Sequence, residues 1–341
     1  IIVRPLENDR AILGTKIKMS ERLWLVTGGA GFIGSHIAER LVREGRRVRI
    51  LDDFSTGKKE HIASFRDKIE IFRGDITDLG DCRRAAKGAD YVIHQAAIRS
   101  VPKSVHNPTA SHEANATGTL HMLIAAKEAK VRRFVYASSS SVYGEAELFP
   151  QKEEHRPRPV SPYAASKLCG ENYAMVFAKS YGLETVSLRY FNVFGPRQDP
   201  ESLYSAVIPK FMEAAFLGRP LEVHWDGRQS RDFTHISNVV QANLLAAKAF
   251  RVIGETFNIA NGKTYSLLDI VSAIEGILGR RLKLEHLPKR AGDVRKTNAD
   301  ISRAKRLLGY RPVMGFEKGI RDTYEYFEKV YFRARRRSAA A

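Results

Sequence analysis

From residue 23 to about residue 190, short apolar runs alternate with amphipathic stretches such as 35–44, 81–86 and 114–129. Buried parallel strands appear in a sequence as apolar runs, and successive parallel strands need helical crossovers between them. The alternation therefore predicts an α/β fold with a doubly wound parallel sheet covered by helices on both faces. The predicted strands are residues 23–27, 47–51, 69–72, 91–94, 134–137, 185–190 and 256–259.

The character of the sequence changes after residue 191, where prolines and glycines become frequent and predicted strands become fewer. We therefore expect a nucleotide-binding domain over 19–191, joined by a returning segment near 234–260. Residues 192–233 and 261–330 are expected to form a smaller α/β C-terminal substrate-binding lobe. Met19 is the expected natural start, and we expect 1–18 and 331–341 to be tails, either disordered or added to the natural chain.

A glycine-rich segment, Gly28-Gly29-Ala30-Gly31-Phe32-Ile33-Gly34, follows the first predicted strand and opens a helix. Gly28 allows a tight turn, Gly31 allows close approach of a pyrophosphate, and Gly34 allows the helix to pack on the strand. The free N–H groups at the start of the helix favour phosphate. With a strand before it and a helix after it, the motif predicts a Rossmann-type dinucleotide site.

Carboxylates follow the second and third predicted strands. Asp52 ends the second strand, where it can accept hydrogen bonds from both ribose hydroxyls and would repel a 2′-phosphate, so NAD is expected rather than NADP. Asp53 is a second carboxylate beside it, and the nearby Lys58 and Lys59 weaken the preference slightly. Asp75, which follows the third strand, is expected beside the adenine or, alternatively, as a helix cap.

Tyr163 and Lys167 are four residues apart in a segment that begins a helix near Pro162, so they share one helical face. A neighbouring ammonium and the positive nicotinamide ring would favour the phenolate of Tyr163, which would make it a usable base. A run of serines, 138–141, follows the fifth predicted strand. A hydroxyl at the carboxyl end of that strand can relay a proton between a substrate hydroxyl and Tyr163.

Several separate segments together make the chain, from about residue 23 to about 326, resemble the extended short-chain dehydrogenase/reductases. Within that family it resembles the group of UDP-glucose and UDP-N-acetylglucosamine 4-epimerases. The segments are the glycine motif, GDITD at 74–78, HQAA at 94–97, SSSSVYG at 138–144, SPYAASK at 161–167, RYFNVFGPR at 189–197 and DGRQSRDF at 226–233.

The resemblance implies roles for individual residues. Tyr163 matches the family's base, Lys167 its cofactor-binding helper and Ser139 its catalytic hydroxyl residue. Further cofactor contacts are implied for Phe32, Ile33, Ile76, Ala96, Ala97 and Tyr190. Substrate contacts are implied for Ser140 and Ser141 beside Ser139, for Asn192, Arg231 and Arg290 at the UDP diphosphate, and for Asp293 at the uridine ribose. The planar fork of an arginine suits phosphate recognition.

The family's members oxidise C4 of a nucleotide sugar and then diverge. Dehydratases and the UDP-glucuronate decarboxylase usually carry an acidic residue two positions before the YG tyrosine, where this chain has Ser141. The resemblance therefore favours epimerisation. Tyr163 would take the 4-hydroxyl proton while hydride passes to NAD, and hydride would return to the other face of a transient 4-keto sugar. An NAD-dependent UDP-hexose 4-epimerase acting on UDP-glucose and UDP-galactose is expected.

Two positions point to different sugars. Thr297 is small where epimerases restricted to glucose and galactose often carry tyrosine, so UDP-N-acetylglucosamine and UDP-N-acetylgalactosamine are possible additional substrates. Arg99 can narrow the pocket or pair with a carboxylate, which leaves a UDP-glucuronate 4-epimerase or decarboxylase as the alternative. A non-catalytic NAD-binding regulator or RNA-binding module is the alternative of another class.

Composition bears on compartment and partners. The net charge is +18, but the basic residues are spread through the helices, so nucleic acid is not the expected partner. Two cysteines outside any CxxC motif predict neither a disulfide framework nor a metal site, and they favour the cytoplasm. No apolar run is long enough to span a membrane. By resemblance, a homodimer is expected through a four-helix bundle of 114–129 and 164–181, with Leu168, Tyr173 and Met175 contributing.

Overall fold

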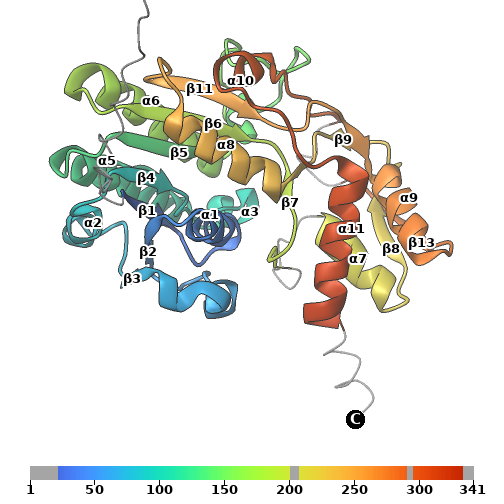
Figure 1. Cartoon of the computed structure of the whole chain (residues 1–341). Helices are drawn as coiled ribbons and strands as arrows, with labels where there is room; N and C mark the ends of the chain where they lie inside the picture. Colours follow the sequence, from blue (N-terminus) through green and yellow to red (C-terminus); the bar gives the residue numbers. More distant parts are fainter. Residues whose placement is uncertain (1–21, 200–206, 290–294, 333–341) are drawn as a thin grey trace, which may run out of the picture.

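A parallel sheet of seven strands forms the larger part of the molecule (Figure 1). The computed structural model describes residues 22–199, 207–289 and 295–332. The strands are β1 Leu23–Thr27, β2 Arg47–Asp52, β3 Glu70–Arg73, β4 Tyr91–His94, β5 Arg133–Ser139, β6 Thr185–Tyr190 and β11 Glu255–Ile259. All seven predicted strands are present, and their ends differ from the prediction by no more than two residues. The predicted doubly wound α/β fold is confirmed.

The order of the strands places a point of reversal between β1 and β4. They lie side by side as β11-β6-β5-β4-β1-β2-β3, and every neighbouring pair is parallel. The chain runs outward from β1 to β3 and then crosses back to β4 on the other side of β1. In such sheets ligands bind beyond the carboxyl ends of the strands at this point of reversal. The glycine-rich loop after β1 and residues 95–97 after β4 both lie there.

Helices cover both faces of the sheet. On one face α1 Phe32–Arg43 contacts α8 Ile236–Lys248, and on the other α5 Gly118–Glu128 contacts α2 Leu79–Ala86 and α6 Pro162–Tyr181. The hydrophobic residues of β1 divide between the two layers: Trp24 and Val26 belong to one buried cluster, whereas Leu23 and Leu25 belong to the other. This alternation is the two-residue period of a strand that is buried on both faces.

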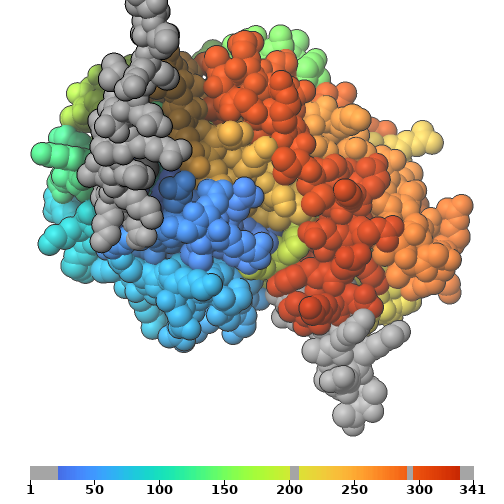
Figure 2. All heavy atoms as spheres, viewed as in Figure 1, coloured from blue at the N-terminus to red at the C-terminus, as the bar shows by residue number. Residues whose placement is uncertain are grey.

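A smaller lobe follows β6, and it lies to the right in Figures 1 and 2, where its C-terminal helices are red and orange. Its helices are α7 Val207–Phe216, α9 Leu267–Leu278 and α11 Phe316–Phe327. Its strands pair as β8 Leu221–His224 with β13 Leu284–Leu287, β7 Val193–Phe194 with β10 Thr234–His235, and β9 Ser230–Arg231 with β12 Tyr265–Ser266. A third buried hydrophobic cluster, which includes Phe194, Phe211 and Phe316, fills this lobe.

One segment of the expected lobe packs on the sheet instead. Helix α10 Ser302–Leu307 contacts β11, and residues from Ala299 to Tyr310 belong to the hydrophobic cluster that contains β11 and α8. This segment lies within the range of 261–330 that was assigned to the lobe, but its hydrophobic side chains pack with the sheet domain. The domain boundaries stay a prediction.

The helix expected over 114–129 is not uniform. Residues Glu113–Thr117 form a π-helical turn, and α5 begins after it at Gly118. A π turn adds one residue to a helical turn, and such turns occur frequently at functional sites. Helix α4 Pro108–His112 directly precedes the turn, and α3 Val101–His106 precedes α4. In the part of the chain that the structure describes, no helix has the length and apolar character needed to cross a bilayer.

Candidate active site

The glycine-rich loop leaves no room for side chains where it turns. Gly28 has a φ of +62°, and a Cβ atom there would lie 2.8 Å from the backbone nitrogen of Ala96. A Cβ atom at Gly34 would collide with the carbonyl oxygen of Gly28. Gly31, at the start of α1, provides no side chain to cap the helix. The N–H groups of the first turn, Phe32 and Ile33 among them, are therefore available to an anion, as a pyrophosphate requires.

Asp52 joins the end of β2 to this loop. One carboxylate oxygen accepts the N–H of Ala30 at 2.8 Å, and the other accepts the N–H of Phe54 at 2.9 Å. Burial raises the pKa of Asp52, and these two backbone hydrogen bonds lower it. A carboxylate oxygen accepts more than one hydrogen bond, so ribose hydroxyls can still bind here. The residues present thus fit the predicted dinucleotide.

The other two predicted carboxylates are exposed and engaged in turns. Asp53 accepts the N–H of Ser55 at 2.9 Å and its hydroxyl at 2.8 Å. Asp75 accepts the N–H of Thr77 at 2.8 Å, while the adjoining Ile76 is buried. It is not the cap of α2, because Asp78 has that role.

The segment after β4 is fixed against β1. The hydroxyl of Thr27 accepts the N–H groups of Gln95 at 3.2 Å and Ala96 at 3.1 Å. The side chain of Gln95 donates to the hydroxyl of Tyr190 at 2.9 Å. Ala96, the half-buried Ala97 and Tyr190 therefore lie at the carboxyl ends of the strands, as Gly28 does.

Tyr163 and Lys167 lie on the face of α6 that meets the sheet. The ammonium of Lys167 lies 4.6 Å from the centre of the Tyr136 ring, and the side chain is 4% exposed. Burial lowers the pKa of Lys167 to about 7, and the charge of Glu171 opposes this. For Tyr163, burial raises the pKa, while a side-chain hydrogen bond with Ser139 and the charge of Arg99 lower it.

Within the protein chain, the charge of Arg99 lowers the pKa of Tyr163. The expected effect of Lys167 on the phenolate of Tyr163 stays a prediction. Arg99 is exposed and lies just before α3, sixty-four positions before Tyr163. The YxxxK motif therefore could not predict that the charge of Arg99 acts on Tyr163.

Within the serine run, Ser141 donates its hydrogen bonds to the hydroxyl of Ser139. Ser139 ends β5 and accepts the N–H of Ser141 at 3.2 Å and its hydroxyl at 2.8 Å. The half-buried Ser140 begins the short helix that follows. Ser139 is therefore in contact with both Ser141 and Tyr163.

Two of the predicted substrate residues, Asn192 and Thr297, are in contact. Asn192, which follows β6 with a φ of +30°, donates from its amide to the hydroxyl of Thr297 and to the carbonyl of Asp232, both at 3.3 Å. Arg231 lies on β9, opposite Tyr265, and donates to the carbonyl of Ser230 at 2.9 Å. Arg290 and Asp293 lie outside the described residues.

Asn115 was missed by the sequence reasoning. It lies in the π-helical turn, is buried, and donates to the carbonyl of Ile98 at 3.0 Å and to Ser166 on α6 at 3.1 Å. Its amide oxygen accepts the N–H of Ile98 at 2.8 Å, so it fixes the segment that carries Arg99. The π turn that places it cannot be seen in helical periodicity, and a polar residue within an apolar helix was the available signal.

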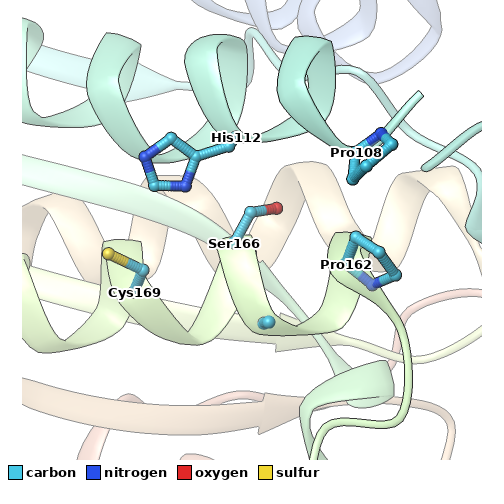
Figure 3. Close-up of a pocket in the computed structure, with 6 residues that line it drawn as sticks. Pro108, His112, Pro162, Ser166 and Cys169 are labelled. Atoms are coloured by element: carbon cyan, nitrogen blue, oxygen red, sulfur yellow. The ribbon is translucent and has the colours of Figure 1, made fainter. Parts of the chain in front are cut away.

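A pocket lies on another side of α6 (Figure 3). Pro108 and His112 face Pro162, Ser166 and Cys169 across it, whereas neither Tyr163 nor Lys167 lines it. Both cysteines of the chain are free thiols. Within the described ranges, no group of three or more histidine, cysteine or acidic side chains is arranged to hold a metal ion.

The chain is similar to a family of known proteins. Residues 24–260 match the model of the NAD dependent epimerase/dehydratase family. The chain is 38% identical to a UDP-glucose 4-epimerase of Mycolicibacterium smegmatis, over 89% of this chain and 97% of that protein.

Two solved structures are similar. A UDP-N-acetylglucosamine 4-epimerase from Methanobrevibacter ruminantium, in complex with UDP-N-acetylmuramic acid, is 38% identical with a TM-score of 0.87, covering 91% of this chain and 99% of that one. A UDP-glucuronic acid 4-epimerase from Bacillus cereus, in complex with UDP-glucuronic acid and NAD, is 34% identical with a TM-score of 0.84, covering 91% and 100%. With a family match over more than half its length and relatives of this similarity, the chain belongs to the NAD-dependent epimerase/dehydratase family.

Proposed function

We propose that this protein is an NAD-dependent UDP-hexose 4-epimerase that interconverts UDP-glucose and UDP-galactose through a transient 4-keto sugar. The observation that carries the proposal is the contact of Tyr163 with Ser139 on the helix face that also carries buried Lys167, at the edge of the sheet where the dinucleotide loop lies. Similarity to a UDP-glucose 4-epimerase over most of both chains supports it.

The cofactor roles follow from the fit of the loop. Gly28, Gly31 and Gly34 leave space for a pyrophosphate, and Asp52 is available to ribose hydroxyls. When bound, NAD supplies a reversible acceptor of hydride at C4 of the sugar. In our proposal Lys167 orients the cofactor and keeps a positive charge close to the base.

The protein's own task is to move one proton. Tyr163 as phenolate takes the proton of the 4-hydroxyl, and the hydroxyl of Ser139 bonds the same oxygen and stabilises charge there. Because the position of the family's elimination acid is Ser141, the site lacks a carboxylate there and the 4-keto sugar returns to a 4-hydroxyl. Asn192, Arg231, Arg290 and Asp293 are the residues that we propose hold the UDP group.

Two observations bear on the sugar. Thr297 is small and its hydroxyl accepts from Asn192, which supports acceptance of N-acetylated sugars. UDP-glucuronate is the second candidate, because the charge of Arg99 acts on Tyr163 and a guanidinium beside the reacting sugar suits a carboxylate. Epimerases of both sugar types are among the similar structures.

The test is incubation of the purified protein with NAD and each of UDP-glucose, UDP-N-acetylglucosamine and UDP-glucuronate, with products resolved by anion-exchange chromatography and NMR. We expect a C4 epimer without net NADH. Release of carbon dioxide from UDP-glucuronate would assign a decarboxylase instead. Failure to convert any of the three would refute the proposal and favour a binding protein that keeps the fold.

Tyr163→Phe should lower kcat about 1000-fold, because a positioned base contributes roughly 10²–10⁴. Tyr181→Phe is the matched control, since Tyr181 ends the same helix and is exposed. Equal loss in both variants would show that Tyr163 acts only through the fold.

We include in the proposal a homodimer formed by α5 and α6 of two copies. The pocket in Figure 3 and a second one lined by Leu168, Tyr173 and Val176 lie along α6, where Met175 and Val176 are exposed apolar residues. A cytoplasmic location is also proposed, and the two free thiols support it.

A further inference from the structure

A third polar residue shares the catalytic face of α6. Tyr163, Lys167 and Glu171 are spaced four residues apart, and the side chain of Glu171 is only 6% exposed. Its carboxylate accepts two hydrogen bonds from Arg189 of β6, at 2.9 Å from Nε and 2.8 Å from Nη2. It also accepts the hydroxyl of Ser138 of β5 at 2.5 Å. One carboxylate therefore joins the helix to two strands.

Stability alone does not account for this arrangement. The side chain of Arg189 is 5% exposed, so both charges have lost most of their hydration. A buried ion pair of this kind is often no more stable than well-packed apolar residues of the same size. Its distinguishing property is geometry, because the bidentate pair and the serine bond hold three elements in one fixed arrangement.

Each of the joined residues adjoins a residue of the site. Ser138 directly precedes Ser139, Arg189 directly precedes Tyr190, and Glu171 lies one helical turn beyond Lys167. A displacement of Glu171 would therefore shift Ser139 relative to Tyr163.

Glu171 also acts on Lys167 through its charge. Among the described residues, the groups that face Lys167 are Glu171 on its own helix, the ring of Tyr136 on β5, and His94 on β4. His94 is neutral at ordinary pH, since burial and the charge of Lys167 lower its pKa to about 3. Glu171 is the anion among these groups, and its charge favours the protonated form of Lys167.

We propose that Glu171, held by Ser138 and Arg189, is a positioning residue that keeps Lys167 charged and holds Ser139 against Tyr163. This rests on the proposed roles of Tyr163, Lys167 and Ser139. Glu171 does not touch the substrate in this proposal. It acts by fixing the distance between α6 and the ends of β5 and β6.

The first test removes one hydroxyl. Ser138→Ala should lower kcat about tenfold, with KM within about twofold, because small misplacement of reacting groups costs rate rather than binding. Ser187→Ala is the matched control: Ser187 is a buried serine on β6, on the same face as Arg189 and outside the bonds described for Glu171. It should leave both constants unchanged.

The second test changes the charge. In Glu171→Gln the pKa of Lys167 should fall, so the alkaline limb of the kcat/KM profile, where Lys167 loses its proton, should move to lower pH by about one unit. Calorimetric titration with NAD across the same pH range should show the same shift in affinity. Ser138→Ala keeps every charge and should leave the limb in place.

The outcomes separate this inference from the proposed function. If the wild-type enzyme epimerises a UDP-sugar while Ser138→Ala matches it in kcat and Glu171→Gln matches its pH profile, the inference is wrong. If Glu171→Gln does not fold, Ser138→Ala and the charge-conserving Arg189→Lys, which should also lower kcat, decide it. If the wild-type protein epimerises nothing, the proposed function fails, and the NAD titrations still test the coupling of Glu171 to Lys167.

Discussion

Lys167 combines a proposed catalytic role with a cost in stability. Its pKa is lowered from 10.5 to about 7 by burial, so the unfolded chain binds more protons than the folded chain between these values. The contribution of Lys167 to the stability of the fold is therefore most unfavourable below pH 7. Between pH 7 and pH 10.5 this contribution makes the free energy of unfolding rise with pH. Lys167→Met should reduce kcat about 1000-fold and yet raise the free energy of unfolding by roughly 1–3 kcal/mol at pH 6.

The increase in the free energy of unfolding caused by Lys167→Met should become smaller toward pH 10. Denaturant unfolding of NAD-free protein at pH 6 and pH 9.5 measures it. Lys179→Met, at an exposed position of the same helix, should change neither activity nor stability by a comparable amount. A Lys167→Met variant that is less stable at both pH values would contradict the argument.

At the scale of elements, the packing of α6 against β5 sets the geometry of the site. Gly170 lies where the helix meets Tyr136, and a Cβ atom there would collide with the phenol of Tyr136. Gly170→Ala should therefore lower the free energy of unfolding by about 1–3 kcal/mol, the usual cost of overpacking, and lower kcat as well. By contrast Gly276→Ala, in α9 with open space around its Cβ position, should be neutral or stabilising by up to about 1 kcal/mol. Equal effects of both substitutions would exclude contact with Tyr136 as the cause.

At the scale of the whole molecule, the exposed side of α6 should be the contact between two copies. Val176 is 42% exposed and lines the second pocket on that helix. Val176→Asp should convert the dimer to a monomer, because an unpaired charge would be buried at the interface. Sedimentation velocity measures this, with Val313→Asp as the control at a position that is 61% exposed and lies between α10 and α11. A monomeric wild-type protein would contradict the proposed assembly.

Much of the fold could be predicted because its signals are local. Strand β1 and the glycine-rich turn are consecutive in the chain, and the steric limit at Gly34 comes from the carbonyl of Gly28 in the same turn. The same holds for Tyr163 and Lys167, which share a helical face through spacing alone. The π turn at Glu113–Thr117 and the packing of α10 on β11 left no comparable local pattern.

The sequence by itself thus determined the order of the strands along the chain, the dinucleotide loop and the pair on α6. Only the tertiary structure decided which residues from other elements act on that pair. Arg99 lowers the pKa of Tyr163, while Arg189 and Ser138, on two strands, hold the carboxylate of Glu171 beyond Lys167. Electrostatic interactions and burial depend on distance in space, and chain spacing specifies that distance only within one helix or strand.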